Sequence, residues 1–212
     1  MYNPASFKQN DPEKLHALIR DYPFATLVSH GPQGLQASQL PFLLYPDEGP
    51  HGVLRAHLAR ANPHAAALAE ADACLVIFQG EHGYVSPSWY PSKTTTHRTV
   101  PTWNYVTVHA HGKARLIDTP EALRRLLHDL TGAHEARRTA PWSIDDAPPD
   151  YIAAQMKAIV GFEIAIDRLE GKWKLSQNKE ANDRQGVIAG LQSPEDPHAH
   201  PALALRMRET GK

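Results

Sequence analysis

The chain has 212 residues, of which 42% are hydrophobic, so it is long enough to bury a sizeable core in one large domain. Its 22 basic and 23 acidic residues give a net charge of −1, which excludes a protein that holds nucleic acid through overall positive charge. The single cysteine, Cys74, excludes an internal disulfide, and the N-terminus has no basic start followed by an apolar segment. These features predict a cytoplasmic protein without a membrane-spanning segment.

The first elements in the chain are a helix and a strand hairpin. Asp11 precedes Pro12, and a capping side chain followed by proline is typical of a helix start. The strand-like segments 24–30 and 35–45 are joined by a turn with a glycine at each end, so they predict a hairpin. Pro41 lacks an N–H for the strand ladder and therefore marks an edge or a bulge.

A third strand, at residues 52–57, runs into a short helix. Asn62 followed by Pro63 predicts the start of that helix, and His57 and Arg60 lie at the junction. A helix N-terminus with a nearby guanidinium favours an anion. An ordinary capped helix with an exposed arginine is the alternative.

The segment around which the chain is organised is the polar, aromatic stretch 81–112. It lies between the apolar strand 73–79 and the alternating strand 105–117, and it combines aromatic, hydroxyl, basic and proline residues. Long loops of this kind on a strand scaffold usually carry binding. Aromatic rings could cover a planar molecule while cations hold its phosphate. A surface loop that its aromatics and prolines hold in place is the alternative.

Downstream, Thr119 and Pro120 start a helix with a leucine stripe. This region is basic, which indicates either a solvated face or a surface for an acidic partner. The basic residues are Arg124, Arg125, Arg137 and Arg138.

The C-terminal part predicts two strands within 160–177, turning at Glu170 and Gly171, and a short helix at 181–191. The polar composition from residue 192 predicts a flexible tail, 192–212, after a single domain over residues 1–191. Strands joined by tight turns, with helices at intervals, indicate an antiparallel barrel with α additions.

No metal site or catalytic group stands out. The chain has 13 histidines, but it lacks the HExxH and CxxC spacings of zinc sites. It also lacks a GxSxG nucleophile elbow and a phosphate-binding P-loop. The sequence therefore predicts a binding site and leaves open whether the protein is an enzyme.

Four motifs stand out along the chain: HLARANP (57–63), YVSPSWY (84–90), VPTWNYVTVHAHG (100–112) and KLSQNK (174–179) with DRQGVIAGL (183–191). Together they resemble the PaiB-type FMN-binding negative transcriptional regulators, and the resemblance extends from residue 1 to about residue 191. It implies a mainly β fold with α additions, the flavin-reductase-like split β-barrel related to pyridoxamine-phosphate oxidases. It also implies a homodimer that binds FMN in a groove between subunits.

In that fold the flavin phosphate is held by the second strand and by the turn after the third strand. The resemblance places Ala37, Ser38 and Gln39 and then His57, Leu58 and Arg60 at these positions. The oxidase relatives have an arginine and a lysine on the second strand, where this chain reads ASQLPFLL. The loop and the other motifs add the candidate flavin contacts Trp89, Lys93, Trp103, Asn104 and Gln177.

The family resemblance implies repression of transcription, yet no helix–turn–helix pair is recognisable, so an indirect effect through a ligand or a partner protein is the alternative to DNA contact. A flavin-dependent oxidoreductase and a haem-binding split-barrel protein, with His57 or a loop histidine on the iron, are the alternative functions.

If Arg60 holds the phosphate, Arg60→Ala would weaken FMN binding by about 2 kcal/mol, roughly thirtyfold in affinity, and leave the affinity for riboflavin unchanged.

Overall fold

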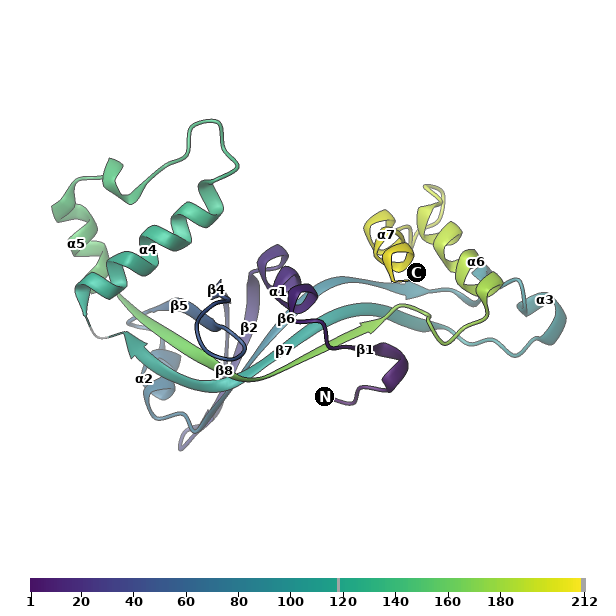
Figure 1. The fold of residues 1–212 in the computed structure, drawn as a ribbon, viewed down its shortest axis with the longest axis horizontal. Helices are drawn as coiled ribbons and strands as arrows, with labels where there is room; N and C mark the ends of the chain where they lie inside the picture. Colours follow the sequence, from purple (N-terminus) through teal and green to yellow (C-terminus); the bar gives the residue numbers. More distant parts are fainter. Residues whose placement is uncertain (118, 211–212) are drawn as a thin grey trace. The chain divides into compact units, whose positions relative to one another are not determined.

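The computed structural model describes residues 1–117 and 119–210, which form a mainly antiparallel β fold with helices (Figure 1). These residues divide into two compact units. Unit 1 comprises Met1–Asp11, Gln79–Val108 and the described residues from Glu170 onward, and unit 2 comprises Pro12–Phe78 and His109–Leu169. The sequence predicts one domain over residues 1–191, and the structure instead distributes that range over both units.

Unit 2 contains a sheet with the strand order β3-β2-β6-β7-β8-β5-β4. Within it β2 pairs antiparallel with β3 and β6, and β5 pairs antiparallel with β4 and β8. Its strands are β2 (Phe24–Gly31), β3 (Gly34–Pro41), β4 (Leu43–Tyr45), β5 (Val53–Ala59) and parts of β6 (Ala73–Val85), β7 (Thr102–Ile117) and β8 (Ile159–Lys174). Its helices are α1 (Pro12–Asp21), α2 (Pro63–Ala69), α4 (Pro120–Glu135), the 3-10 turn η3 (Ile144–Asp146) and α5 (Pro149–Lys157).

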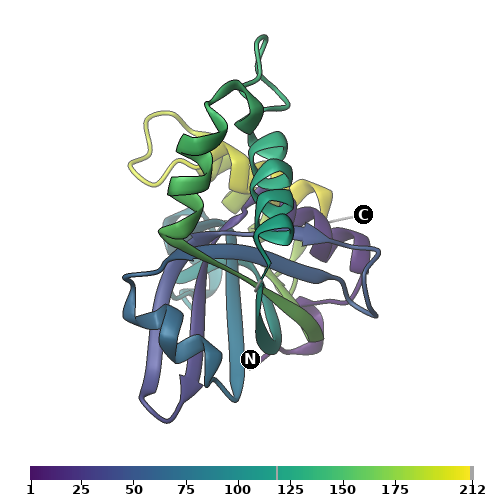
Figure 2. The same cartoon turned by 90° about the vertical axis from the view of Figure 1, so that its left-hand side faces the viewer.

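The core of unit 2 forms around three phenylalanines. The ring of Phe42 meets the rings of Phe78 and Phe162 edge-on, with centroids 5.9 and 6.0 Å apart. Burying each ring stabilises the fold by about 1.5–3 kcal/mol, and the edge-to-face geometry adds about 0.5–1.5 kcal/mol. The predicted leucine stripe buries Leu123, Leu126 and Leu130 of α4. Helices α4 and α5 lie side by side (Figure 2).

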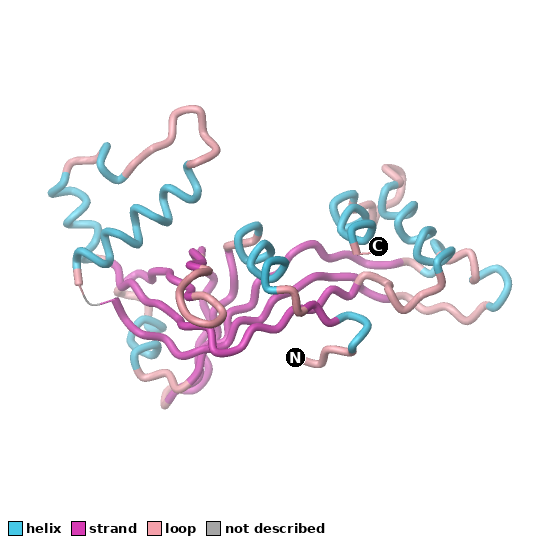
Figure 3. Tube along the Cα trace, in the orientation of Figure 1, coloured by secondary structure: helices cyan, strands magenta, loops and turns pink. Residues whose placement is uncertain are grey.

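Unit 1 consists of the remaining parts of β6, β7 and β8, the short strand β1 (Lys8–Gln9) and several helices (Figure 3). Strand β1 pairs antiparallel with β8 through Lys8 opposite Lys172. Helices α6 and α7 pack on each other. The helical segments are η1 (Ala5–Phe7), η2 (Pro87–Trp89), α3 (Lys93–Thr96), α6 (Ala181–Gln192) and α7 (Pro201–Glu209).

Two C-terminal expectations differ from the structure. The chain does not turn at Glu170 and Gly171, because β8 continues through them and Gly171 pairs with Gln9 of β1. The predicted flexible tail contains α7, whose apolar residues Leu203, Ala204 and Met207 are buried. The hydrophobic face of a nine-residue helix is stable only when a second surface covers it, and here α6 does so.

The local predictions near the N-terminus are confirmed. Helix α1 begins at Pro12, and β2 and β3 form the predicted hairpin. The predicted strand 35–45 is divided, because β3 ends at Pro41 and Leu43–Tyr45 form β4, which pairs with β5. The predicted loop at 81–112 is shorter than expected, since β6 continues to Val85 and β7 begins at Thr102.

Among the described residues, no helix has both the length and the apolar character needed to cross a bilayer.

Candidate functional site

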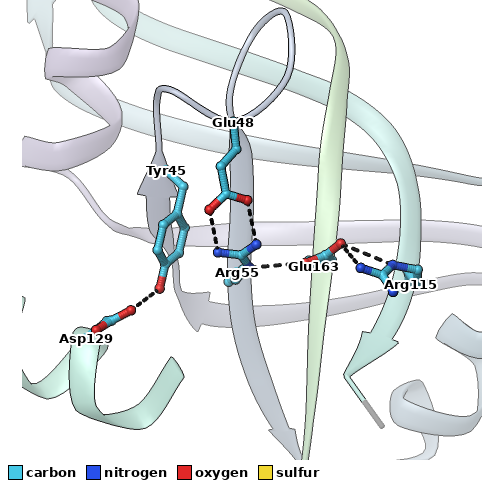
Figure 4. Close-up of polar contacts among 6 residues, drawn as sticks. All are labelled: Tyr45, Glu48, Arg55, Arg115, Asp129 and Glu163. Atoms are coloured by element: carbon cyan, nitrogen blue, oxygen red, sulfur yellow. Dashed lines mark hydrogen bonds and ion pairs between the residues drawn. The ribbon is translucent and has the colours of Figure 1, made fainter. Parts of the chain in front are cut away.

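A polar network lies on one face of β5 and β8 in unit 2 (Figure 4). Arg55 and Glu163 are directly opposite each other on these strands, so their side chains project to the same face. The Arg55 Nε donates to Glu163 at 3.1 Å, and its terminal nitrogens donate to Glu48 at 2.9 and 2.6 Å. Arg115 of β7 donates to the other Glu163 oxygen at 2.6 Å. Glu163 therefore bridges two arginines.

This network controls the protonation of its members. Burial alone would raise the pKa of Glu163, but the hydrogen bonds from Arg115 and Arg55 hold that pKa below its ordinary value. Burial and the Asp129 carboxylate together raise the pKa of Tyr45 to about 12, and the Tyr45 hydroxyl donates to Asp129 at 2.7 Å. Tyr45 is thus a fixed hydrogen-bond donor that joins β4 to α4, and not a base.

A pocket of about 290 Å³ opens beside the network. Its walls include three arginines and two glutamates, which leaves a lining charge of +1. Arg125 from α4 is the arginine without an ion-pair partner in the part of the chain that the structure describes. Most of the positive charge here is already neutralised by Glu48 and Glu163, so the network mainly ties the strands to the helix.

The predicted phosphate residue Ser38 is buried and serves a different contact. Its hydroxyl lies 2.8 Å from Nδ1 of His64, and the hydroxyl of Ser29 lies 2.9 Å from Nε2 of the same ring. Burial lowers the pKa of His64, so the ring is neutral, with one nitrogen donating and the other accepting. The three side chains form a buried chain that fixes α2 on the hairpin. Nothing in the local sequence marks His64 as the partner of two hydroxyls from other elements.

Arg60 is held at the C-terminal end of α5. Its Nε donates to the Lys157 carbonyl and its Nη2 to the Ile159 carbonyl, both at 2.9 Å. The Arg60 backbone N–H donates to the Ala158 carbonyl at 2.8 Å. The last carbonyls of a helix have no partner within the helix and carry partial negative charge, which a guanidinium satisfies. Arg60 thereby connects the end of β5 to α5.

The other three predicted residues of unit 2 differ in whether their side chains can still contact a ligand. Leu58 is a core residue, and Gln39 is exposed on β3. His57 carries a buried Nδ1 for which the described residues supply no hydrogen-bond partner, and burial lowers its pKa. A buried polar atom without a partner costs free energy, so it is an atom that a bound ligand would satisfy.

In unit 1, Trp89 is an anchor for α6. Its indole nitrogen donates to Asp196 at 2.8 Å. Its ring lies so close to Gly190 that a Cβ on that glycine would come within 2.4 Å of ring atoms. Lys93 is exposed, with its ammonium group 3.4 Å from the Ser88 hydroxyl. Trp89 is therefore committed to packing, while Lys93 is accessible.

Trp103 belongs to an exposed aromatic cluster in unit 1. Its side chain is 48% exposed and stacks on His82 with centroids 6.1 Å apart. Tyr84 meets Trp103 edge-on at 6.2 Å and lies 4.7 Å from the His198 ring. Four rings on one surface can cover a planar ligand or a second copy of the chain.

The last two predicted residues of unit 1 stabilise their surroundings. The Asn104 amide is buried and donates to Ser176 at 3.0 Å and to the Met207 sulfur at 3.6 Å. The Gln177 side chain accepts from the Leu175 N–H and donates to the Trp173 carbonyl. Of the ten predicted residues, five lie in unit 2 and five in unit 1. Those that retain accessible or unsatisfied polar or aromatic groups are Gln39, His57, Lys93 and Trp103.

Known proteins are similar to this chain in sequence and in fold. Residues 1–168 match the family described as "Putative FMN-binding domain". The chain is 34% identical to the protease synthase and sporulation protein PAI 2 of Bacillus subtilis, over 94% of this chain and 93% of that protein. It is 37% identical to an uncharacterised protein of Emericella nidulans, over 84% of this chain and 85% of the relative.

Two solved structures share the fold at lower identity. The FAD and haem binding protein from Mycobacterium smegmatis superposes with a TM-score of 0.60 at 21% identity, over 86% of this chain and 80% of that one. The flavocytochrome Anf3 from Azotobacter vinelandii superposes with a TM-score of 0.62 at 16% identity, over 84% of this chain and 75% of that one. At these identities the likeness establishes the split-barrel fold and nothing about the ligand.

Proposed function

The chain belongs to the FMN-binding domain family, and from this premise we propose that it is an FMN-binding negative regulator of transcription whose output depends on its flavin. The observation that carries the proposal is the family match over residues 1–168. The 34% identical relative in Bacillus subtilis is named for protease synthesis and sporulation, two cellular processes and not a reaction, which supports a regulatory role. The single buried cysteine favours action in the reducing cytoplasm.

FMN is the cofactor, and part of the predicted residue set fits it. His57 offers a buried nitrogen that lacks a partner among the described residues, Gln39 offers an exposed amide, and Trp103 offers an exposed ring surface. Ser38 and Arg60 fit less well, because their polar groups already contact His64 and the end of α5. When bound, FMN would supply a ring system that exchanges electrons. We propose Gln39 and His57 of unit 2 as flavin contacts. In unit 1, the predicted residues that remain accessible are Lys93 and Trp103.

We propose that regulation proceeds without direct reading of DNA. Two of the four arginines that make the α4 region basic are paired with carboxylates, Arg124 with Asp145 at 2.5 Å and Arg138 with Glu135 at 3.1 Å. Paired guanidinium groups contribute less to phosphate binding than free ones. A ligand-dependent contact with another protein is therefore the favoured route.

A flavin-dependent oxidoreductase or haem protein is the second candidate function. The specific observation in its favour is His57, a half-buried imidazole whose pKa burial lowers and whose buried Nδ1 has no hydrogen-bond partner among the described residues. The absorption spectrum of the purified protein separates a haem protein from a flavoprotein, because a flavin absorbs in the blue and near-ultraviolet whereas haem gives a Soret band. Turnover of reduced nicotinamide by the flavin-loaded protein would favour the oxidoreductase over the regulator.

We also propose that the protein is a homodimer, and we expect light scattering to give twice the mass of the chain. The exposed cluster around Trp103, together with the exposed Val100 nearby in sequence, supplies apolar surface of the kind that subunit interfaces cover. The measurement is made at micromolar concentration with and without FMN. A monomer under both conditions would remove the dimer from the proposal.

The flavin function is tested by titrating FMN and riboflavin into the wild-type protein and into Arg60→Ala, following flavin fluorescence. We expect FMN to bind the wild type. Because the Arg60 guanidinium is engaged with carbonyl oxygens, we expect the variant to weaken FMN and riboflavin by the same factor. Removing two exposed hydrogen bonds should cost about 1 kcal/mol of stability. Lys113→Ala, which removes an exposed charge elsewhere in unit 2, is the control.

Each outcome decides a separate point. A wild-type protein that binds neither flavin contradicts the FMN function. A loss confined to FMN, near the thirtyfold expected from sequence, would instead establish Arg60 as the phosphate contact.

A further inference from the structure

A small pocket in unit 1 has walls rich in hydrogen-bond donors. Its volume is about 170 Å³, and its lining includes Lys174, Lys179, Thr102, Ser176 and Asn178. Ligand sites for whole drug-sized molecules are usually about 300–1,000 Å³, so this pocket suits one small group and not a flavin ring. All five residues belong to one unit, and four of them, all except Thr102, lie in the KLSQNK motif.

Among the described residues, the lysines at this pocket have no carboxylate partner. The Lys174 ammonium group donates to the Thr102 hydroxyl at 2.5 Å and to the Trp103 carbonyl. The Lys179 ammonium group lies 5.0 Å from the centre of the Tyr90 ring. Neighbouring Lys172 donates to the Tyr2 carbonyl at 2.9 Å. Across residues 1–117 and 119–210, no acidic side chain forms an ion pair with any of the three.

In the described part of the chain, no carboxylate offsets the repulsion that Lys172 and Lys179 exert on Lys174. Burial lowers the pKa of Lys174, and repulsion from Lys172 and Lys179 lowers it further. An anion placed between the lysines would relieve this repulsion and regain part of the solvation that Lys174 loses. Uncompensated, partly buried like charges that face a pocket are typical of ligand sites.

The backbone at the pocket wall is also constrained. Ser176 has φ of +62°, a left-handed conformation that costs free energy for a residue with a side chain. Its hydroxyl is fixed by the buried Asn104 amide, with contacts of 3.0 and 3.2 Å. This turn brings Lys179 back beside Lys174, since the Lys179 N–H donates to the Ser176 carbonyl at 3.1 Å. The two side-chain contacts with Asn104 therefore hold Ser176 in this uncommon backbone conformation.

We propose that Lys174 and Lys179, with Thr102 and Asn178, form a binding site for the phosphate group of a small molecule. The two ammonium groups supply charge and donors, while the hydroxyl and amide supply directional hydrogen bonds. The positive field of Lys172 supports the site without lining it. The phosphate could belong to FMN or to a separate phosphorylated ligand. The site does not depend on the flavin function, and it stands if FMN does not bind.

The test is a calorimetric titration of the full-length protein with inorganic phosphate at constant ionic strength. Lys179→Gln removes a charge whose ammonium makes no hydrogen bond among the described residues, so the fold should be preserved. Loss of one charge-assisted contact should weaken phosphate by about tenfold to a hundredfold. Lys174→Gln should act in the same direction, and Lys113→Gln, an exposed lysine of unit 2, should leave binding unchanged. Circular dichroism of each variant verifies folding.

Saturable phosphate binding that both pocket variants weaken supports the site. Absence of saturable binding to the wild type, or equal binding to wild type and Lys179→Gln, overturns it. A second arm identifies the source of the phosphate. If phosphate competes with FMN, and Lys179→Gln lowers the affinity for FMN but not for riboflavin, the flavin phosphate occupies the pocket. If neither added phosphate nor Lys179→Gln changes the affinity for FMN, a separate phosphorylated molecule is the ligand.

Discussion

Gly112→Ala is expected to destabilise unit 2 by about 3 kcal/mol or more, at the upper end of the cost of overpacking a core. A Cβ at Gly112 would lie 2.2 Å from the Ala165 carbonyl oxygen and 2.8 Å from the Ile164 side chain, both on β8. A backbone carbonyl in a paired strand cannot rotate away as a flexible side chain does. Urea unfolding, followed by circular dichroism, measures the change in midpoint.

Gly132→Ala is the matched control for this substitution. Gly132 lies in α4, and a Cβ added there meets no atom within 4 Å. Alanine is a better helix former than glycine by up to about 1 kcal/mol, so this variant should be equally or more stable than the wild type. Equal midpoints for Gly112→Ala and Gly132→Ala would show that β7 and β8 are not as close at Gly112 as described.

Glu163→Gln is expected to destabilise the protein by about 2 kcal/mol at neutral pH, because it leaves Arg55 with a weaker partner on a partly buried strand face (Figure 4). The pair with Arg115 contributes little, since the Arg115 side chain is 77% exposed and solvent screens its charge. For a chain of this size the melting temperature should fall by about 4–8 °C. Glu195→Gln, at an exposed position in unit 1, is the control.

The effect of Glu163→Gln should also depend on pH. The folded protein holds the pKa of Glu163 below its ordinary value, so the unfolded chain binds the proton more readily. The stabilisation is therefore fully present above the unfolded pKa of about 4.3 and is lost as the pH falls through the lower folded value. Denaturant unfolding of wild type and variant across this range measures it. A stability difference that stayed constant down to the lowest pH would show that the carboxylate charge is not the cause.

Local signals in the sequence predicted most of the elements but not where distant strands pair. The capping pair Asn62-Pro63 and the glycine turn of the hairpin act within a few residues, and both appear in the structure as expected. Gly171 looked like a turn because glycine favours turns, yet its partner Gln9 lies far away in the sequence. The helix at 201–209 depends likewise on a distant surface, that of α6.

The sequence by itself determined the family and the kinds of groups available: aromatic rings, hydroxyls, amides and a few cations, carried by four motifs. Only the tertiary structure decided which of these groups are already engaged. Arg60 has the right chemistry for a phosphate, but it donates to the Lys157 carbonyl at the end of α5 and to the Ile159 carbonyl at the start of β8. Lys174 also donates to the Thr102 hydroxyl and the Trp103 carbonyl, but its ammonium group has a third donor, and the ammonium group of Lys179 has no hydrogen-bond partner among the described residues. Both lysines line a pocket, and neither has a carboxylate partner in the described part of the chain. The reason is physical: the sequence specifies the charge of a side chain, while its partners and its burial depend on elements that only folding brings together.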